Sequence, residues 1–269
     1  MLNFKQNSTM SENQKVWKPT EEAKSQAGQF RLFAVLLWLG AIVAQVFAIR
    51  MFLQAVNAGE SPVNAWVIGL IVLDLILVFS GSILWKKSNR LSPPSEKNQF
   101  LYYMQNQLGV VMAFVAFLPL IVFILTNKKV DGKSKAILGS IAGLALVIAG
   151  IGGFESNMAS IEKYTEETNM VEALTGANNV YWTKSGGRYH LYQDCGYIKN
   201  STEVTNGTVA QSYETKGIDQ LCQRCKKQKM KEENITDESL LDKIKQLNPT
   251  ENKEETAPAE EVVEEKDAA

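Results

Sequence analysis

One histidine and three cysteines near the C-terminal end of the chain are the residues best suited to bind a metal ion. His190, Cys195, Cys222 and Cys225 fall within 36 residues of a 269-residue sequence that has no other histidine or cysteine. Structural zinc sites use four tetrahedral nitrogen and sulfur ligands, and a Cys-x2-Cys pair often supplies two of them. The pattern His-x4-Cys-x26-Cys-x2-Cys therefore predicts one Zn²⁺ ion per chain, held by these four side chains.

Four protein ligands would complete the coordination of this ion and leave no position for a reactive water. We therefore expect structural zinc, which stabilises a domain too small to build a large apolar core. No catalytic residue is predicted, and the chain is not expected to be an enzyme. The alternative is a redox pair, Cys222 and Cys225, with two bystanders. Such pairs usually lie at a helix start in a thioredoxin-like βαβ unit, which the surrounding sequence does not indicate.

Short elements around the four residues predict a small α+β domain over residues 179–230. Within residues 180–192, β-branched and aromatic residues flank a Ser-Gly-Gly turn, which is typical of a hairpin. A short helix is expected to begin at Thr208 and to end at Gly217. Residues 155–178 are expected to form a linker helix that joins this domain to the rest of the chain.

The order of these motifs resembles the small metal-binding domain of the Ada DNA-repair methyltransferase and its relatives, some of which are attached to bacterial hydrolases and membrane proteins. In Ada the first ligand is a cysteine that accepts a methyl group from a DNA phosphotriester. Here His190 takes that position, so the resemblance implies the zinc site but not methyl transfer. The whole chain also looks like bacterial four-span membrane proteins with a C-terminal zinc module. The Ada-like resemblance rests on Tyr189-His190, Cys195, the helix ending at Gly217, and Leu221-Cys222-x2-Cys225.

A run of lysines follows the last cysteine. Lysine side chains at this density would suit the phosphates of a nucleic acid, although such a run is more often a solvated helix face. Nucleic-acid binding is therefore kept as an alternative function. The run consists of Lys226, Lys227, Lys229 and Lys231.

Residues 30–154 contain four long apolar segments and are expected to form a transmembrane domain of four helices. A helix needs roughly 20 apolar residues to cross the hydrocarbon core, and it satisfies its own backbone hydrogen bonds there. The alternative is that one or more segments are buried helices of a soluble protein. The fold class predicted is thus a membrane all-α domain followed by the zinc domain. The expected spans are about 31–53, 63–85, 102–126 and 136–153.

Three features inside the spans bear on function or packing. Asp74 lies near the middle of the second segment, where a carboxylate is costly and indicates a functional site by default. It could equally be protonated, or bonded to a polar neighbour such as Gln45, Ser80 or Arg50. Small residues at helical spacing allow helices to approach closely, and we expect packing of this kind at Gly139 and Gly143. Pro119 is expected to kink the third span.

The orientation of the spans follows from the placement of basic residues, which favour the cytoplasmic side. With four spans both termini share one side, and nine basic residues lie there against four on the other. Both termini are therefore predicted to be cytoplasmic, in the cell membrane, although the lysine-rich third loop conflicts with the rule. The nine are Lys5, Lys15, Lys18, Lys24, Arg31, Lys86, Lys87, Arg90 and Lys97, and the four are Lys128, Lys129, Lys133 and Lys135.

Polar segments flank these two domains. Residues 1–29 form a polar N-terminal segment, and residues 231–269 are expected to be an acidic, largely disordered tail. Within that tail, residues 236–247 are expected to form a helix capped by Thr236.

These expectations combine into an integral membrane protein whose cytoplasmic structural-zinc domain serves as an interaction or sensing module. The lipid bilayer, an unknown protein partner and other copies of the chain are the expected partners. One alternative is a transporter or channel regulated by the zinc domain. The other is a membrane-tethered nucleic-acid-binding protein.

Overall fold

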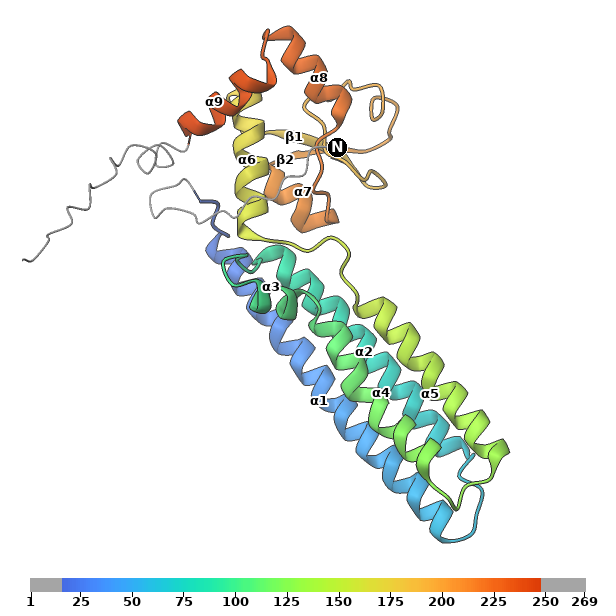
Figure 1. The fold of residues 1–269 in the computed structure, drawn as a ribbon. Helices are drawn as coiled ribbons and strands as arrows, with labels where there is room; N and C mark the ends of the chain where they lie inside the picture. Colours follow the sequence, from blue (N-terminus) through green and yellow to red (C-terminus); the bar gives the residue numbers. More distant parts are fainter. Residues whose placement is uncertain (1–15, 248–269) are drawn as a thin grey trace, which may run out of the picture.

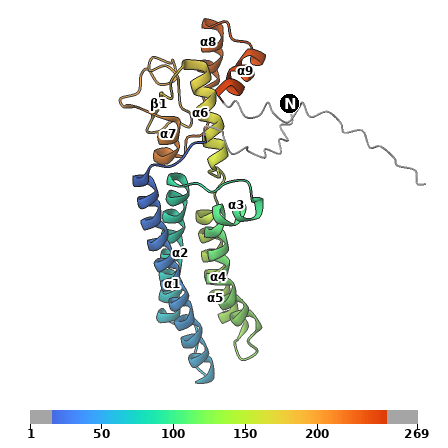
Figure 2. The ribbon, with the colours of Figure 1, turned by 90° about the vertical axis from the view of Figure 1, so that its left-hand side faces the viewer.

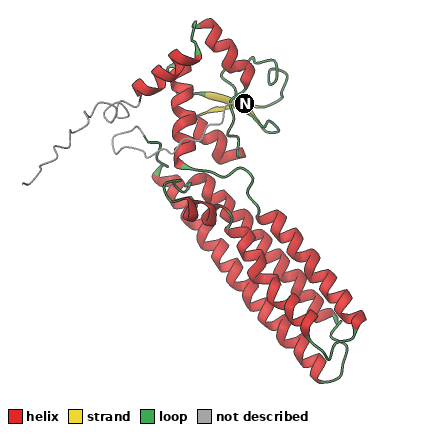
Figure 3. Cartoon of the chain, in the orientation of Figure 1, coloured by secondary structure: helices red, strands yellow, loops and turns green. Residues whose placement is uncertain are grey.

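A bundle of long helices carries a smaller mixed domain at one end (Figure 1). The computed structural model describes residues 16–247. The expectations for residues 1–15 of the N-terminal segment and for residues 248–269 of the acidic tail lie outside this range. Helices dominate both parts, and the strands are confined to the smaller domain (Figure 3).

The bundle consists of four long helices, with a fifth, short helix between the second and third of them. Within the described residues, four helices are long and apolar enough to cross a membrane. This confirms the predicted number of helices able to cross a membrane. The bundle helices are α1 Glu21–Asn57, α2 Ala65–Leu91, α3 Gln99–Asn106, α4 Leu108–Thr126 and α5 Gly132–Gly153.

Helix α1 begins at a side-chain cap. The hydroxyl of Thr20 accepts a hydrogen bond from the backbone N–H of Ala23 at 3.1 Å, which satisfies one of the free donors of the first turn. Glu21 and Glu22 follow and suit the positive end of the helix dipole. With 37 residues α1 is about 55 Å long, so it extends beyond a hydrocarbon core of about 30 Å.

Apolar side chains lie both inside and outside the bundle. Phe52, Phe117 and Leu120 are fully buried in one continuous core that joins all four long helices. At the same time Leu36 and Leu144 are exposed on outer faces. An apolar exterior of this extent is costly in water and is what a lipid-facing surface requires.

The third span differs from the expected helix over residues 102–126, because the structure divides it at Gln107. That residue ends α3 and precedes α4 with non-helical backbone angles. Its amide Nε2 donates to the carbonyl of Glu155 at 2.8 Å, and its Oε1 accepts from the Glu155 N–H at 3.2 Å. The break thus lets one polar side chain bind the backbone that follows α5. Beyond it, α4 continues through Pro119, where the expected kink stays a prediction.

The close helix contacts involve other glycines than the expected pair. A methyl group on Gly143 would meet no atom within 4 Å, and one on Gly139 would meet only Leu125 at ordinary contact distance. By contrast, a methyl group on Gly153 would lie 2.5 Å from the backbone of Gly109. The tight crossing is therefore between the start of α4 and the end of α5.

The smaller domain contains four helices and one two-stranded antiparallel sheet among the described residues. Its first helix lies beside the sheet, and the last two cover the side away from the bundle (Figure 1). The elements are α6 Ile161–Thr175, β1 Val180–Thr183, β2 Val204–Gly207, α7 Val209–Lys216, α8 Gln223–Glu232 and α9 Asp237–Leu247.

The helix ends lie where the sequence predicted them. The strand pairing differs, because β1 pairs mainly with a strand outside the predicted hairpin. Thr208 caps α7, and Gly217 ends it with a φ of +67°, a conformation that favours glycine. Thr236 accepts from the N–H of Ser239 at the start of α9, as expected. The regular partner of β1 is β2, and the predicted hairpin segment contributes one bridge, Tyr181 to His190.

The α4–α5 crossing makes a stability prediction. We expect Gly153→Ala to lower the free energy of unfolding in detergent by about 1–3 kcal/mol, because the new methyl group overlaps backbone that cannot rotate away. Gly143→Ala is the matched control and should leave the thermal midpoint unchanged or slightly raised. Equal losses for both variants would contradict the crossing.

Candidate metal centre

The four residues singled out by the sequence come together in the core of the smaller domain. One ligand atom from each of His190, Cys195, Cys222 and Cys225 lies within 4.8 Å of the other three. All four side chains are buried, and the most accessible of them, Cys195, is only 7% exposed. This cluster can hold a metal ion.

The spacing of one donor pair agrees with a tetrahedral site. Nδ1 of His190 and Sγ of Cys225 are 3.6 Å apart. Around zinc, with bonds of about 2.3 Å to sulfur and 2.05 Å to nitrogen, two tetrahedral ligands of these types lie about 3.6 Å apart. These two donors thus stand at the separation that a central ion of this size would impose, and all four lie within 4.8 Å of one another.

Helix α8 positions two of the ligands through its N-terminus. Cys222 is the N-cap residue, and Cys225 lies in the first turn, so both sulfurs lie at the positive end of the helix dipole. The carbonyl of Cys222 accepts a hydrogen bond from the N–H of Lys226 at 3.0 Å. Helix α8 therefore begins at the first cysteine of the pair.

Backbone pairing brings His190 to that helix start. His190 exchanges two hydrogen bonds with Tyr181 of β1, at 2.7 and 2.8 Å. On the other side, the carbonyl of Tyr189 accepts from the N–H of Cys222 at 2.8 Å, in a parallel bridge that also involves Leu221. The ladder therefore runs from β1 through the histidine to the first residue of the Cys-x2-Cys pair.

Cys195 comes from a tight turn rather than from a strand or helix. Its carbonyl accepts hydrogen bonds from the N–H groups of Ile198 and Lys199, at 2.8 and 2.9 Å. The side chain of Ile198 is buried in the same apolar cluster as the cysteines. This turn holds the fourth donor against the other three.

Burial shifts the pKa values of two groups in the cluster. Burial raises the pKa of the Cys225 thiol to about 12, so its thiolate form needs a nearby positive charge. Burial, and secondarily the charge of Arg188, lower the pKa of His190, which keeps the imidazole neutral and able to bind metal. Redox-active cysteines show the opposite pattern, a lowered pKa and access to solvent. These directions weigh against the redox alternative.

Two tyrosines beside the ligands, the buried Tyr189 and the partly buried Tyr192, form hydrogen bonds that the sequence did not indicate. The hydroxyl of Tyr189 donates to Glu167 of α6, and that of Tyr192 donates to Glu232 at the end of α8. Val171 of α6 also packs in the apolar cluster that contains the cysteines. The helix expected to be only a linker is therefore part of the core that supports the metal centre.

Asp74 lies in the bundle, far along the chain from this cluster, and is 2% exposed. Within residues 16–247, its Oδ1 has no hydrogen-bond partner, and the same is true of Nε2 of the buried Gln45. The structure therefore places the carboxyl where the sequence predicted, in the interior of the second span. None of the neighbours considered in the sequence, Gln45, Ser80 and Arg50, donates a hydrogen bond to this oxygen.

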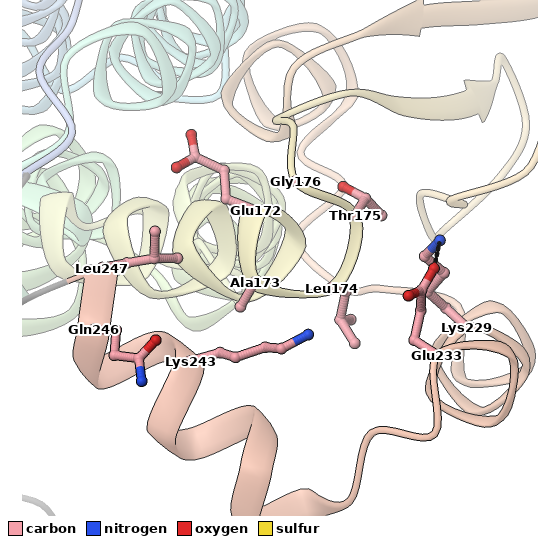
Figure 4. A pocket seen from close by; sticks show the side chains of 10 residues that line it. All are labelled: Glu172, Ala173, Leu174, Thr175, Gly176, Lys229, Glu233, Lys243, Gln246 and Leu247. Atoms are coloured by element: carbon pink, nitrogen blue, oxygen red, sulfur yellow. Dashed lines mark hydrogen bonds and ion pairs between the residues drawn. The ribbon is translucent and has the colours of Figure 1, made fainter.

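A pocket between the end of α6 and helices α8 and α9 contains none of the four donor residues. An ion pair between Lys229 and Glu233, at 2.9 Å, borders it (Figure 4). Lys243 and Gln246 of α9 form the opposite wall. The metal centre is thus a separate, buried feature of the domain.

The metal centre predicts the effect of losing one donor. Cys222→Ser should reduce the metal content of the purified chain from about one ion to near zero, because a buried serine hydroxyl is a poor ligand beside two thiolates. The control Tyr197→Ser changes an exposed residue between the ligands and should leave the content unchanged. Elemental analysis measures both. Retention of metal by Cys222→Ser would contradict the assignment.

Comparison with protein-family models, with curated proteins and with solved structures finds no match for this chain. Its description therefore rests on its own sequence and geometry. The chain combines four helices able to cross a membrane with a buried His-Cys-Cys-Cys cluster able to hold a metal ion.

Proposed function

We propose that the chain is an integral membrane protein whose C-terminal domain holds one structural zinc ion and acts in the cytoplasm as an interaction or sensing module. The observation that carries the proposal is the closed donor set. Four buried protein ligands fill a tetrahedral site and leave no position for a substrate or a catalytic water.

Zinc is the cation that best suits these donors. Three thiolates and one imidazole favour zinc or another soft divalent ion over magnesium or calcium, which prefer oxygen ligands. Binding of this kind can supply about 10 kcal/mol or more to folding. The domain has short strands and a small apolar cluster, so we assign the ion a role in folding. The Ada-like order of the motif supports the same assignment.

The domain is fixed to the end of the bundle rather than suspended from it. The hydroxyl of Tyr164 donates to the carbonyl of Arg90 in α2 at 2.8 Å, and the Arg90 guanidinium lies 3.6 Å from the Glu155 carboxylate. The hydroxyl of Tyr213 in α7 donates to the carbonyl of Asn157 at 2.7 Å. Through these contacts a structural change in the domain can be transmitted to the membrane-spanning helices, which a sensing role requires.

The surface offered to a partner lies on α8, which is distant from the bundle in both ribbon views (Figures 1 and 2). Arg224, Lys227 and Lys231 are exposed there. A basic face of this kind favours an acidic partner, whether a protein segment or the phosphates of a nucleic acid. We therefore propose α8 as the recognition helix of the module.

The cytoplasmic placement rests on the basic residues at the end of the bundle that carries the domain. Positive residues near span ends favour the cytoplasmic side. The opposite end also carries lysines, in the α4–α5 loop. The proposed orientation therefore rests on the larger number of basic residues at the domain end. Among the described residues, those at the domain end are Lys18, Lys24, Arg31, Lys86, Lys87, Arg90 and Lys97.

Labelling tests both the metal and the side of the membrane, since all three cysteines of the chain are in this domain. After treatment with a permeant chelator, a membrane-impermeant maleimide should modify them only in permeabilised cells. Without chelator, modification should be slow even after permeabilisation, because the thiolates are buried and metal-bound. Glu60→Cys, in the exposed α1–α2 loop at the other end, should be modified in intact cells. Modification of the native cysteines in intact cells would place the domain outside.

A second candidate function is transport or conduction regulated by the metal domain, and the state of Asp74 favours it. A buried carboxyl oxygen without a partner inside a span is costly, and such groups often bind a proton or a cation in transit. Much of the surrounding core is apolar, and Gln45 of α1 and Ser82 of α2 are buried polar side chains in the same bundle.

Flux measurements decide this second function. If it holds, liposomes with the wild-type chain should conduct protons or monovalent cations, and Asp74→Asn should reduce the flux at least tenfold. Glu60→Gln, which neutralises an exposed carboxylate outside the spans, should leave the flux unchanged. Equal flux in the two variants, or no flux from the wild-type chain, would exclude it.

A further inference from the structure

Among the described residues, no other helix or strand covers the apolar face of the short helix α3. At about 100° per residue, its exposed apolar residues occupy a single arc of about 160°. The opposite side of the helix carries Tyr102 and Asn106, which are buried. The arc consists of Phe100, Leu101, Tyr103 and Met104, of which Phe100 is the most accessible at 72%.

Hydrogen bonds fix α3 at a defined level of the bundle. Nε1 of Trp85 donates to the carbonyl of Gln105 at 2.7 Å, and Nδ2 of Asn89 donates to the same carbonyl at 2.9 Å. Both donors belong to α2. Along that helix, Trp85 lies 19 residues from Trp66, a rise of about 29 Å. The two tryptophans are therefore separated by about the thickness of a hydrocarbon core.

That spacing places α3 at a boundary of the membrane. Tryptophan and tyrosine gather where hydrocarbon meets the headgroups, and Trp66 is 74% exposed near the start of α2. If Trp66 marks one boundary, Trp85 and the helix bonded to it lie at the other. Both ribbon views show α3 at the domain-side end of the bundle (Figures 1 and 2).

The buried side of α3 is joined to the base of the metal domain. Nδ2 of Asn106 donates to the carbonyl of Ala159 at 3.3 Å, just before α6. The hydroxyl of Tyr102 lies 3.5 Å from the carbonyl of Met158, at the limit of a hydrogen bond. The apolar arc is therefore turned away from the protein because the polar side of the helix is engaged.

We infer that α3 is an interfacial helix whose apolar arc is inserted into the lipid boundary beside the bundle. The bilayer is the expected partner of this face, because α3 leads directly into the membrane-spanning helix α4 and lies at the level of Trp85. An amphipathic helix at this level buries its apolar side among acyl chains and keeps its polar side toward protein or water. The inference rests on the membrane-spanning part of the proposed function and is independent of the metal.

Photocrosslinking in liposomes tests the contact directly. The full chain is prepared with p-benzoylphenylalanine in place of Phe100, and lipid adducts are counted by mass spectrometry after irradiation. The same replacement at Leu144, an exposed residue of the α5 span, is the lipid-facing reference. Replacement at Tyr197 is the matched control, since this aromatic residue of the metal domain is 71% exposed.

We expect the adduct yield at Phe100 to approach that at Leu144 and to exceed that at Tyr197 several-fold. A replacement at Tyr103, on the same arc, should repeat the result if the first variant folds poorly. A yield at both arc positions no higher than at Tyr197 would overturn the inference. So would crosslinks to a second copy of the chain in place of lipid. Absence of adducts at Leu144 as well would overturn the membrane assignment together with it.

Discussion

Three thiols and one imidazole share a volume from which water is largely excluded, and the C-terminal domain is arranged around this constraint. Unpaired thiolates would be costly there, whereas a divalent cation satisfies all four donors at once. The start of α8, the bridge at His190 and the turn at Cys195 each deliver one part of the set. Because these elements are far apart in sequence, a cation bound by the cluster would link distant parts of the domain.

The membrane bundle reaches the same domain through polar contacts at one end. Gln107 binds the backbone of Glu155, whose carboxylate faces Arg90, and the carbonyl of Gly217 accepts from Nδ2 of Asn157. Gly217 lies five residues before the ligand Cys222. Only the short stretch from Gly217 to Cys222 therefore separates these polar contacts from the metal cluster.

Local signals in the sequence predicted the features that depend on residue type and short spacing. The ligands were identifiable because no other histidine or cysteine competes, and the caps at Thr208 and Thr236 depend only on neighbours. The break at Gln107 was missed because its cause, the backbone of Glu155, is distant in the chain. The tight glycine crossing at Gly153 was missed for a similar reason: which small residue faces another helix depends on how the helices pair. The partner of β1 and the place of α6 in the core are likewise set by tertiary contacts.

The ordered connection between α5 and α6 has a consequence for recognition. Residues 154–160 are held by Lys86, Gln107 and Tyr213 through their backbone carbonyls and N–H groups. A domain on a flexible tether loses translational and rotational freedom when it binds, and that loss weakens affinity. Here the freedom is already restricted in the free protein. If α8 is the recognition helix proposed above, a partner would meet a preorganised surface at a fixed height above the bilayer, and neighbouring chains in one membrane would present that surface in parallel.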